Sequence, residues 1–443
     1  MRTLRIGSGA GFADDRVDPA VELAEHGRLD HLVFECLAER TIALAQRRRR
    51  HDPAAGHDEW LAERMEAVLE PCARRGIRVL TNMGAANPVA AAETTAEVAR
   101  RLGLTGLRIA AVTGDDVLDL VHRLDPGLLD RTGTASSLDG VLSANAYLGC
   151  EPVVRALAAG ADVVITGRIA DPALHLAPLV HEFGWRLDDW QRLGAGLGVG
   201  HLLECAGQLT GGYFADPGVH DVPGLARLGF PLAEVAEDGT AAVTKVAGTG
   251  GQVTVATCTE QLLYEVHDPA AYVCPDAVVD FSGAELRQVD EDVVAVSGIT
   301  GRPRPDRLKV SIGHLDGWSG HGEISYAGPN ALARGRLARD VVRERLQRAG
   351  VDTARARFDL VGVDAVAGAA PPGAEPPEVR LRVAARTSDH DAARRVGREV
   401  TALWLNGPAG GAGATRGERE IVAVASALVP RELVTTGIEV REV

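Results

Sequence analysis

Short apolar runs alternate with long amphipathic segments through the first half of the chain, and this alternation restricts the fold more than any other feature. The apolar runs lie at 3–6, 31–37, 77–80, 107–112 and 162–166. Short continuous apolar strands separated by helices predict βαβ units, whose strands form a parallel sheet that is buried on both faces. We therefore predict an α/β fold with a Rossmann-like parallel sheet flanked by helices.

The sequence pattern changes after about residue 230. Residues 277–325 favour strands and turns, and residues 332–349 have the periodicity of an amphipathic helix. We therefore predict a second, α+β and strand-rich C-terminal part. The expected organisation is a parallel α/β domain over 1–228 that carries the main cleft, followed by an α+β part over 229–443 with glycine-rich loops. These two parts can pack as one body.

Charge and composition exclude several classes of protein. The 443 residues include 61 Asp and Glu but only 47 Lys and Arg, so the formal net charge is -14, and only 4% of the residues are aromatic. Nucleic-acid binding needs a basic field or aromatic stacking surfaces, so we expect no nucleic-acid partner. The chain has no apolar stretch as long as a membrane span and no apolar leader, so we expect no membrane partner.

Six cysteines occur along the chain, and none of them forms a C-x-x-C pair. A zinc ribbon and a thioredoxin-like site both need such pairs, so neither is expected. Cysteines within apolar runs are typically small core residues. Free cysteines of this kind are typical of proteins in a reducing compartment. We therefore expect a cytoplasmic protein.

Polar residues follow several of the predicted strands. Asn82 and Asn87 follow the third strand, and Arg168 and Asp171 follow the strand at 162–166. In parallel α/β sheets, ligands bind outside the carboxyl ends of the strands, so these side chains predict a ligand cleft at that edge. Asn and Asp before Pro are also ordinary helix caps, which is the structural alternative for Asn87 and Asp171.

Two further polar residues, Asn145 and Tyr147, precede a helix that is predicted to begin near Glu151. Both can face the same cleft as Arg168 and bind substrate there. A helix cap and a packed tyrosine are the alternative interpretation.

The segment 196–212 is predicted to form a buried helix with one polar stripe. At 3.6 residues per turn, His201, Glu204, Cys205 and Gln208 fall on this stripe, and the remaining positions are mainly Leu, Gly and Ala. A buried polar stripe must be paired internally or line a cavity. His201 with Glu204 is a candidate general acid–base pair, and Gln208 a candidate substrate contact. Half of a metal site and a satisfied core network are the alternatives.

Glycine-rich turns form the candidate anion sites. Lysine occurs only at Lys245 and Lys309, and every other basic residue is Arg. Lys245 lies shortly before one such turn, so we predict an anion site there and a specific role for this lysine, whereas Lys309 has no such neighbourhood. A hairpin turn is the alternative interpretation. The predicted anion-binding residues are Gly9, Gly11, Gly248, Thr249, Gly250 and Gly251.

Several longer motifs are shared with a known family. They include TNMGAANP, GADVVITGRIADPAL, GHLLECAGQLTGG, VTKVAGTGG and NGPAGG, and they occur in the family's order over nearly all of the chain. On these motifs the chain resembles the acyclic terpene utilization protein AtuA family. The resemblance implies a place in the bacterial catabolism of citronellol and geraniol through CoA thioesters. Longer members carry an appended C-terminal ferredoxin-like domain, which we expect this chain to lack.

The resemblance implies an enzyme of the hydratase, isomerase or lyase type that acts on a carboxylic acid or an acyl-CoA thioester. His201, Glu204, Asp171 and Lys245 are the catalytic candidates, and the asparagines can polarise a carbonyl. The alternative is a non-catalytic metabolite-binding or assembly protein that uses the same cleft. We expect no redox cofactor, since the first glycine loop lacks the third glycine of G-x-G-x-x-G, and no metal. We expect CoA only as part of the substrate. We also expect a homo-oligomer, because most soluble oligomers are built from identical chains.

Overall fold

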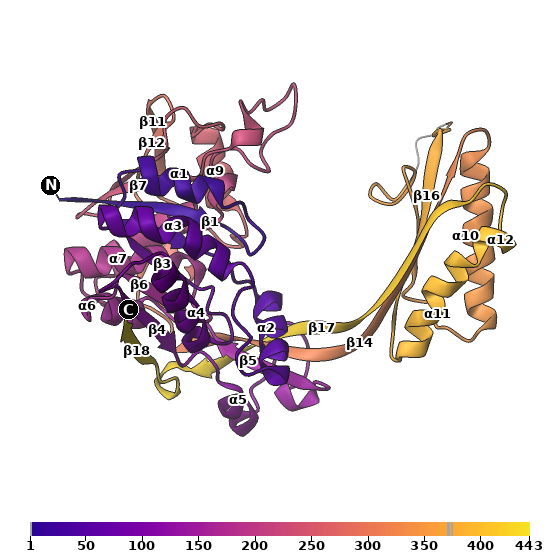
Figure 1. The fold of residues 1–443 in the computed structure, drawn as a ribbon, viewed down its shortest axis with the longest axis horizontal. Coiled ribbons are helices and arrows are strands. Elements are labelled where there is room, and N and C mark those ends of the chain that lie inside the picture. Colours follow the sequence, from indigo (N-terminus) through magenta and orange to yellow (C-terminus); the bar gives the residue numbers. More distant parts are fainter. Residues whose placement is uncertain (1, 370–372, 374) are drawn as a thin grey trace. The chain divides into compact units, whose positions relative to one another are not determined.

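The structure is a computed structural model that describes residues 2–369, 373 and 375–443. The chain forms two compact units (Figure 1). Unit 1 comprises Met1–Gly313 and Val424–Val443, and unit 2 comprises His314–Ala423.

Unit 1 is built on one mixed sheet. Its five central strands run parallel to one another, and the strands outside them on both sides are antiparallel to their neighbours. The order across the sheet is β11 (Glu285–Asp290), β12 (Val293–Ser297), β8 (Ala241–Lys245), β7 (Pro231–Ala236), β1 (Thr3–Ala10), β2 (His31–Phe34), β3 (Arg78–Thr81), β6 (Val163–Thr166), β4 (Arg108–Thr113) and β18 (Gly437–Glu442).

The predicted α/β class is confirmed, and the predicted Rossmann-like arrangement is not. In a Rossmann sheet the first strand has parallel neighbours on both sides, because the chain winds outward from it in two directions. Here β1 has a parallel neighbour, β2, on one side and an antiparallel neighbour, β7, on the other. The parallel strands therefore form the middle of a larger mixed sheet.

Helices cover both faces of the parallel part of this sheet and explain why central strands such as β6 are almost entirely apolar. In β6, Val164 belongs to a core with residues of α7 and α8, whereas Val163 and Ile165 belong to a core with residues of α1, α3 and α4. The helices of unit 1 are α1 (Asp18–His26), α2 (Glu39–His51), α3 (Leu61–Arg75), α4 (Pro88–Arg101), α5 (Leu118–Leu124), α6 (Glu151–Ala158), α7 (Asp171–Phe183), α8 (Trp190–Glu204) and α9 (Val255–Leu263).

The structure does not divide the chain near residue 228. Residues 229–313 belong to unit 1, because β7, β8, β12 and β11 continue the sheet that begins with β1. A three-stranded sheet of β9 (Tyr272–Val273), β10 (Val278–Asp280) and β13 (Thr300–Arg302) also lies in this part. The change in sequence pattern after about residue 230 reflects a change from parallel strands to antiparallel ones within unit 1.

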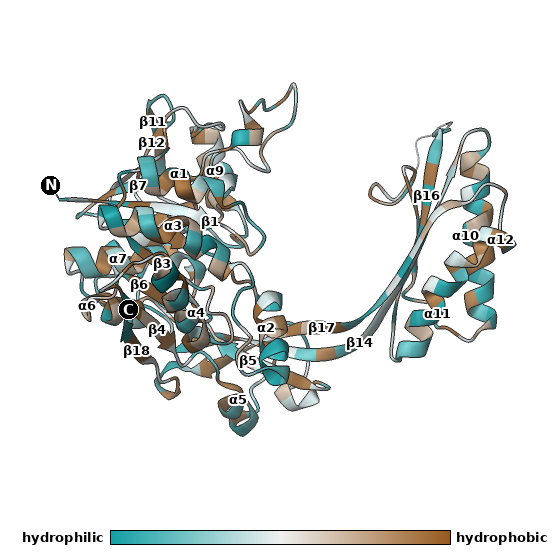
Figure 2. Ribbon diagram, in the orientation of Figure 1, coloured by the Kyte–Doolittle hydropathy of each residue, from teal (hydrophilic) through white to brown (hydrophobic). Residues whose placement is uncertain are grey.

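Unit 2 has the βαββαβ order of a ferredoxin-like fold. Its elements are β14 (Arg307–Ala327), α10 (Ala331–Arg348), β15 (Arg357–Val361), β16 (Glu378–Thr387), α11 (His390–Thr401), the short α12 (Leu403–Asn406) and β17 (Ala412–Pro430), and its strands lie in the order β15-β16-β14-β17. We expected no ferredoxin-like part in this chain, yet a unit of this topology lies inside it. In Figure 2, α10 and α11 each carry both hydrophobic and hydrophilic residues, as helices packed on one face of a sheet do.

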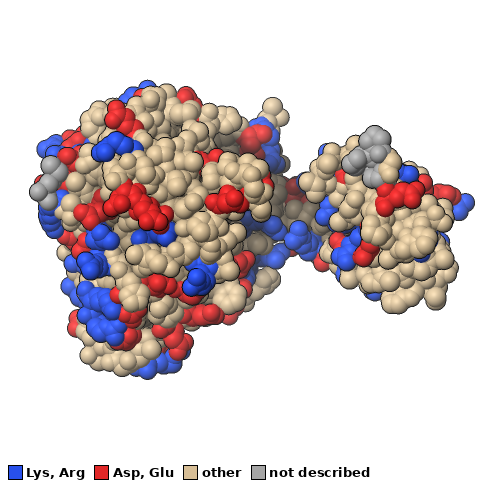
Figure 3. Space-filling view, turned by 90° about the horizontal axis from the view of Figure 1, so that it is seen from above, with Lys and Arg blue, Asp and Glu red and all other residues tan. Residues whose placement is uncertain are grey.

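The chain passes from unit 1 into unit 2 inside β14 and returns inside β17. The short strand β5 (Val141–Ala146) of unit 1 pairs with β14. On the face shown in Figure 3, acidic and basic side chains are interspersed. In the part of the chain that the structure describes, no helix is both long and apolar enough to cross a membrane.

Candidate functional site

A cavity of about 620 Å³ lies in unit 1 at the carboxyl ends of the parallel strands. Gly11 and Phe12, directly after β1, and Glu35, directly after β2, line the cavity, and Asp171 lines it at the start of α7, which follows β6. Strands that run parallel end at one edge of the sheet, which explains why residues far apart in sequence meet here. Glu204, at the end of α8, closes the cavity on another side.

Gly11 allows the end of α8 to approach β1 closely. A Cβ atom added at Gly11 would lie 2.5 Å from the carbonyl carbon of Cys205, which is closer than real side chains come. Cys205 lines the cavity beside Glu204. The glycine therefore fixes where the end of α8 stands relative to β1.

His201 and Glu204 form a buried pair at the cavity wall. The Nδ1 atom of His201 lies 2.6 Å from Oε1 of Glu204, and the imidazole packs against Tyr272 and Phe281, with ring centroids 5.1 and 5.6 Å away. The other oxygen, Oε2 of Glu204, has no hydrogen-bond partner among the described residues, nor does Nε2 of His201. Buried polar atoms are nearly always paired, so this carboxyl oxygen has capacity to bond a ligand.

The pKa values of this pair follow from burial and mutual contact. Burial raises the pKa of Glu204, and the neighbouring imidazole does not fully reverse that effect. Burial alone would lower the pKa of His201, but the Glu204 carboxylate and its hydrogen bond raise the pKa of His201 instead. The pair therefore retains a proton to higher pH than either isolated side chain would.

Glu35 is a second buried carboxyl in the cavity. Its Oε1 accepts hydrogen bonds from the backbone N–H of Leu37 at 2.9 Å and from Nδ2 of Asn82 at 2.7 Å. Asn82 is held in turn by the N–H of Cys36, which donates to Oδ1 at 2.7 Å. Asn82, which we predicted to bind substrate, is thus placed behind Glu35 and fixes its orientation. Burial raises the pKa of Glu35, although Arg168 acts in the opposite sense.

The Arg168 guanidinium is buried and bonded to the protein. It donates to the carbonyls of Leu37 and Ile169 and to the carboxylate of Asp171, and it lies 4.5 Å from the ring centre of Tyr147. These contacts use most of its donors, and Arg168 is not among the residues that line the cavity, so the geometry does not favour it as the group that holds a substrate carboxylate. Tyr147 and Asp171 do line the cavity, as the sequence led us to expect of cleft residues.

Tyr147, Glu39 and Lys309 form a third polar group in the cavity. The Tyr147 hydroxyl and the Lys309 ammonium both donate to Oε1 of Glu39, at 2.5 and 3.1 Å, and Nζ of Lys309 lies 4.8 Å from the tyrosine ring centre. Partial burial opposes ionisation of Glu39, but these hydrogen bonds and the lysine charge lower its pKa to about 2. Exposed Arg307, two residues before Lys309 on β14, also lines the cavity.

The remaining predicted substrate contacts lie outside the cavity. Asn87 caps α4, because its side chain accepts a hydrogen bond from the N–H of Ala90 at 3.3 Å. The alternative interpretation of Asn87 as a helix cap is therefore confirmed. Asn145 donates to buried Asp115 at 2.9 Å. Gln208 lies beyond the end of α8, in a 3₁₀ turn, because the helix expected over 196–212 ends at Glu204.

The Lys245 ammonium and the backbone N–H groups of the turn after it are bonded to other parts of the protein. The Lys245 ammonium lies 2.9 Å from Oδ2 of Asp292 and donates to the carbonyl of Thr249 at 3.0 Å. The backbone N–H groups of Thr249, Gly250 and Gly251 each donate to a protein carbonyl. An anion cradle needs free N–H groups and an unpaired cation, so the geometry does not support the predicted anion site or a catalytic Lys245.

The other glycines of the predicted anion sites have structural roles. Gly248 adopts a positive φ of 84°, which suits glycine in a tight turn. A Cβ atom at Gly9 would lie 2.7 Å from the ring of Phe34, and the N–H of Gly11 donates to Oδ2 of Asp15 at 2.9 Å. These contacts account for the glycines through packing and backbone conformation.

Among the described residues, the cysteines are free thiols with raised pKa values, and no cluster of side chains suits a metal ion. All six cysteines are free thiols, and burial raises the pKa of Cys205 to about 12, so this thiol stays protonated at neutral pH. Within the described residues, no group of three His, Cys, Asp or Glu side chains is arranged to hold a metal ion.

Glu35, Glu39 and Lys309 line the cavity but were not selected from the sequence. Glu35 directly follows β2 in the run HLVFE, so the rule that selected Asn82 and Arg168 could also have found it. Lys309 lies on β14, far from the parallel strands in sequence, and no local motif indicates its place.

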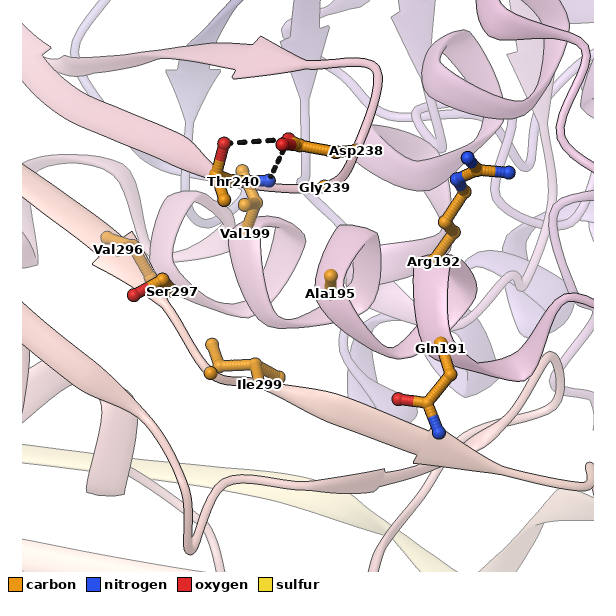
Figure 4. A pocket seen from close by; sticks show the side chains of 11 residues that line it. Gln191, Arg192, Ala195, Val199, Asp238, Gly239, Thr240, Val296, Ser297 and Ile299 are labelled. Carbon is orange, nitrogen blue, oxygen red and sulfur yellow. Dashed lines mark hydrogen bonds between the residues drawn. The ribbon is translucent and has the colours of Figure 1, made fainter.

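A smaller hollow of about 160 Å³ lies between α8 and the turn from β7 to β8 (Figure 4). Gln191 and Arg192 line it from α8, and Asp238 accepts two hydrogen bonds from Thr240 at 3.0 and 2.7 Å on the opposite side. Across the described part of the chain, none of the side chains that line this hollow has a buried polar atom without a partner. The hollow therefore lacks the buried reactive groups of the larger cavity.

Fold and geometry together define a mixed α/β protein with a cavity at the carboxyl edge of its parallel strands. The chain belongs to the family described as acyclic terpene utilisation family protein AtuA, whose model matches residues 4–440. Membership associates the chain with acyclic terpene utilisation. No curated protein and no solved structure matches the chain.

Proposed function

We propose that the protein is an enzyme that moves protons on a carboxylic acid or acyl-CoA thioester, in a reaction of the hydratase, isomerase or lyase type. The observation that carries this proposal is the His201–Glu204 pair: Glu204 lines the cavity, and its Oε2 is buried and unpartnered among the described residues. A carboxyl group whose pKa is raised holds its proton more readily than a free one and can act as a general acid or base. His201 acts through Glu204 by holding its orientation and proton.

The cavity wall offers a place for each part of such a substrate. Apolar residues such as Phe12, Leu308 and Leu428 can contact an acyl chain. Arg307 has no ion pair or hydrogen bond among the described residues, and with Lys309 it can hold an anionic part of the substrate, such as a carboxylate or a CoA phosphate. We place this reaction in acyclic terpene utilisation, in the cytoplasm, and propose a homo-oligomer.

The test is turnover of a panel of saturated, unsaturated and hydroxylated acyl-CoA thioesters in deuterated water. Mass change and deuterium incorporation report hydration, isomerisation or cleavage. Glu204→Gln should abolish these changes, whereas Glu344→Gln, at an exposed residue of unit 2, should leave them unaltered. Equal rates for the wild type and Glu204→Gln would contradict the proposal.

The alternative is a non-catalytic metabolite-binding or assembly protein. It predicts that a thioester binds the wild-type protein without any mass change or deuterium incorporation. The buried pair favours the enzyme, because a binder gains nothing from a buried carboxyl whose pKa is raised and whose second oxygen is unpaired.

A further inference from the structure

Two buried carboxyl groups from different elements line the same cavity. Glu35 follows β2 and is 7% exposed, and Glu204 ends α8 and is 8% exposed. Burying a carboxyl is costly even beside a partner, so a protein that keeps two in one cavity needs a reason. Enzymes that must protonate one atom and deprotonate another use such pairs.

The surroundings of the two carboxyls differ in a way that assigns roles. Burial raises the pKa of Glu35, but Glu35 accepts two N–H donors on one oxygen, and these bonds and the positive charge of Arg168 act against that rise. Glu204 has one partner, His201, and a second oxygen with none among the described residues. Glu35 is therefore suited to accept a proton, and the His201–Glu204 pair is suited to donate one.

We propose that Glu35 is a second catalytic residue of this cavity and acts as the base opposite Glu204, and that the substrate is an acyl compound with a double bond next to its carbonyl, to which water is added or from which it is formed. This inference rests on the proposed function and narrows it to one reaction type. The groups that act on Glu35 are Arg168, Glu204 and the bonds from Leu37 and Asn82.

The reaction balances without a cofactor. In the direction of hydration, Glu35 takes a proton from water while the water oxygen bonds to the β-carbon. The π electrons of the double bond then form a bond from the α-carbon to the proton that Glu204 gives up. One C–O bond and one C–H bond form, one π bond is lost, and both carboxyls return to their starting states by exchange with solvent.

The two roles can be separated with two reactions. Hydration of an α,β-unsaturated acyl-CoA needs both carboxyls, whereas exchange of the α-proton of saturated butyryl-CoA with deuterated water needs only Glu204. Glu35→Gln should lower hydration about 10²–10⁴-fold and change α-proton exchange less than about threefold. Glu204→Gln should lower both rates, and Glu344→Gln should lower neither.

Glu35→Asp controls for folding, because it keeps the carboxyl but shortens its reach. It should recover part of the hydration rate that Glu35→Gln loses, at an unchanged midpoint of thermal unfolding. Hydration by Glu35→Gln at the wild-type rate, with Glu204→Gln inactive, would overturn the role of Glu35 and leave the proposed function standing. A wild-type protein that catalyses neither reaction would overturn both proposals.

Discussion

The Nδ1 atom of His201 lies 2.6 Å from Oε1 of Glu204, one helical turn further along α8. This contact occupies one carboxyl oxygen and leaves the other, which is buried, without a partner among the described residues, in a side chain that lines the cavity. The helix ends at Glu204, so the carboxyl belongs both to a rigid element and to the cavity wall. A proton donor held in this way can act without first reorienting.

Replacement of His201 should impair the chemical step more than substrate binding. His201→Asn keeps a hydrogen-bonding group but cannot hold the proton of the pair, so we expect kcat to fall about 10²-fold while KM changes less than about threefold. Steady-state kinetics on the active thioester measures both parameters. An increase in KM at constant kcat would show that His201 only shapes the binding surface.

Lys245 should matter for stability rather than for ligand binding. Lys245→Met removes the ion pair with Asp292 and the bond to the Thr249 carbonyl, so we expect the free energy of unfolding to fall by about 1–3 kcal/mol. Urea denaturation measures this change, and calorimetry with CoA should give an unaltered affinity. A selective loss of CoA affinity at unchanged stability would restore the anion site that the sequence led us to predict.

Arg307 should contribute to the binding of an anionic substrate. Arg307→Ala should raise KM about tenfold, which corresponds to about 1.4 kcal/mol, and leave kcat within about twofold. Arg348→Ala, at an exposed arginine of unit 2, is the matched control and should change neither. Equal KM values in the two variants would show that the substrate anion binds elsewhere.

Gly11 should tolerate no larger residue. Gly11→Ala places a Cβ atom 2.5 Å from the Cys205 backbone, so the end of α8 must move, and we expect a loss of about 1–3 kcal/mol of stability together with lower activity. Gly127→Ala is the control, since a Cβ atom there meets nothing within 4 Å. Thermal unfolding of both variants checks the prediction, which equal midpoints would contradict.

Two buried histidines should make the protein sensitive to acid. Burial lowers the pKa of His31 and of His175 to about 3, whereas both titrate near 6.5 in the unfolded chain. Between these values the unfolded state binds more protons, so the free energy of unfolding falls as pH falls from 6.5 toward 3. Each histidine contributes up to about 1.4 kcal/mol per pH unit.

His175→Leu tests this dependence, because neither ring nitrogen of His175 has a hydrogen-bond partner among the described residues. Urea denaturation between pH 7.5 and 4.5 should show a shallower decline in stability for the variant. Comparison with the wild type cancels the contributions of other titrating groups to the pH dependence. One such group is Asp115, because burial raises its pKa to about 6. Parallel pH curves would contradict the prediction.

The parallel part of the fold could be predicted from the sequence because its cause is local. Strands buried on both faces are apolar at every position, and runs such as DVVIT show this directly. The antiparallel strands β7, β8 and β12 could not be assigned to the same sheet, because pairing between distant segments leaves no local pattern. The βαββαβ order of unit 2 was missed for the same reason.

The candidate site was predictable only in part. Glu204, Asp171 and Tyr147 were selected as polar residues beside predicted strands or on one helix stripe, and the cavity includes them. Lys245 and Lys309 show the limit of this reasoning. A glycine-rich neighbourhood favoured Lys245, but the tight connection from β8 to α9 produces the same pattern without binding an anion. The place of Lys309 depends on β14 reaching Tyr147 and Glu39, which are distant in sequence.

The antiparallel pairing of β18 with β4 has a consequence for synthesis. Ile438 lies opposite Val112 and Val440 opposite Ala110, so the edge of the main sheet is covered by a strand that follows unit 2 in the chain. Unit 2 ends at Ala423 and is complete in the growing chain before that strand exists. The smaller unit can therefore fold during translation, whereas the edge beside β4 stays open until β18 has been synthesised.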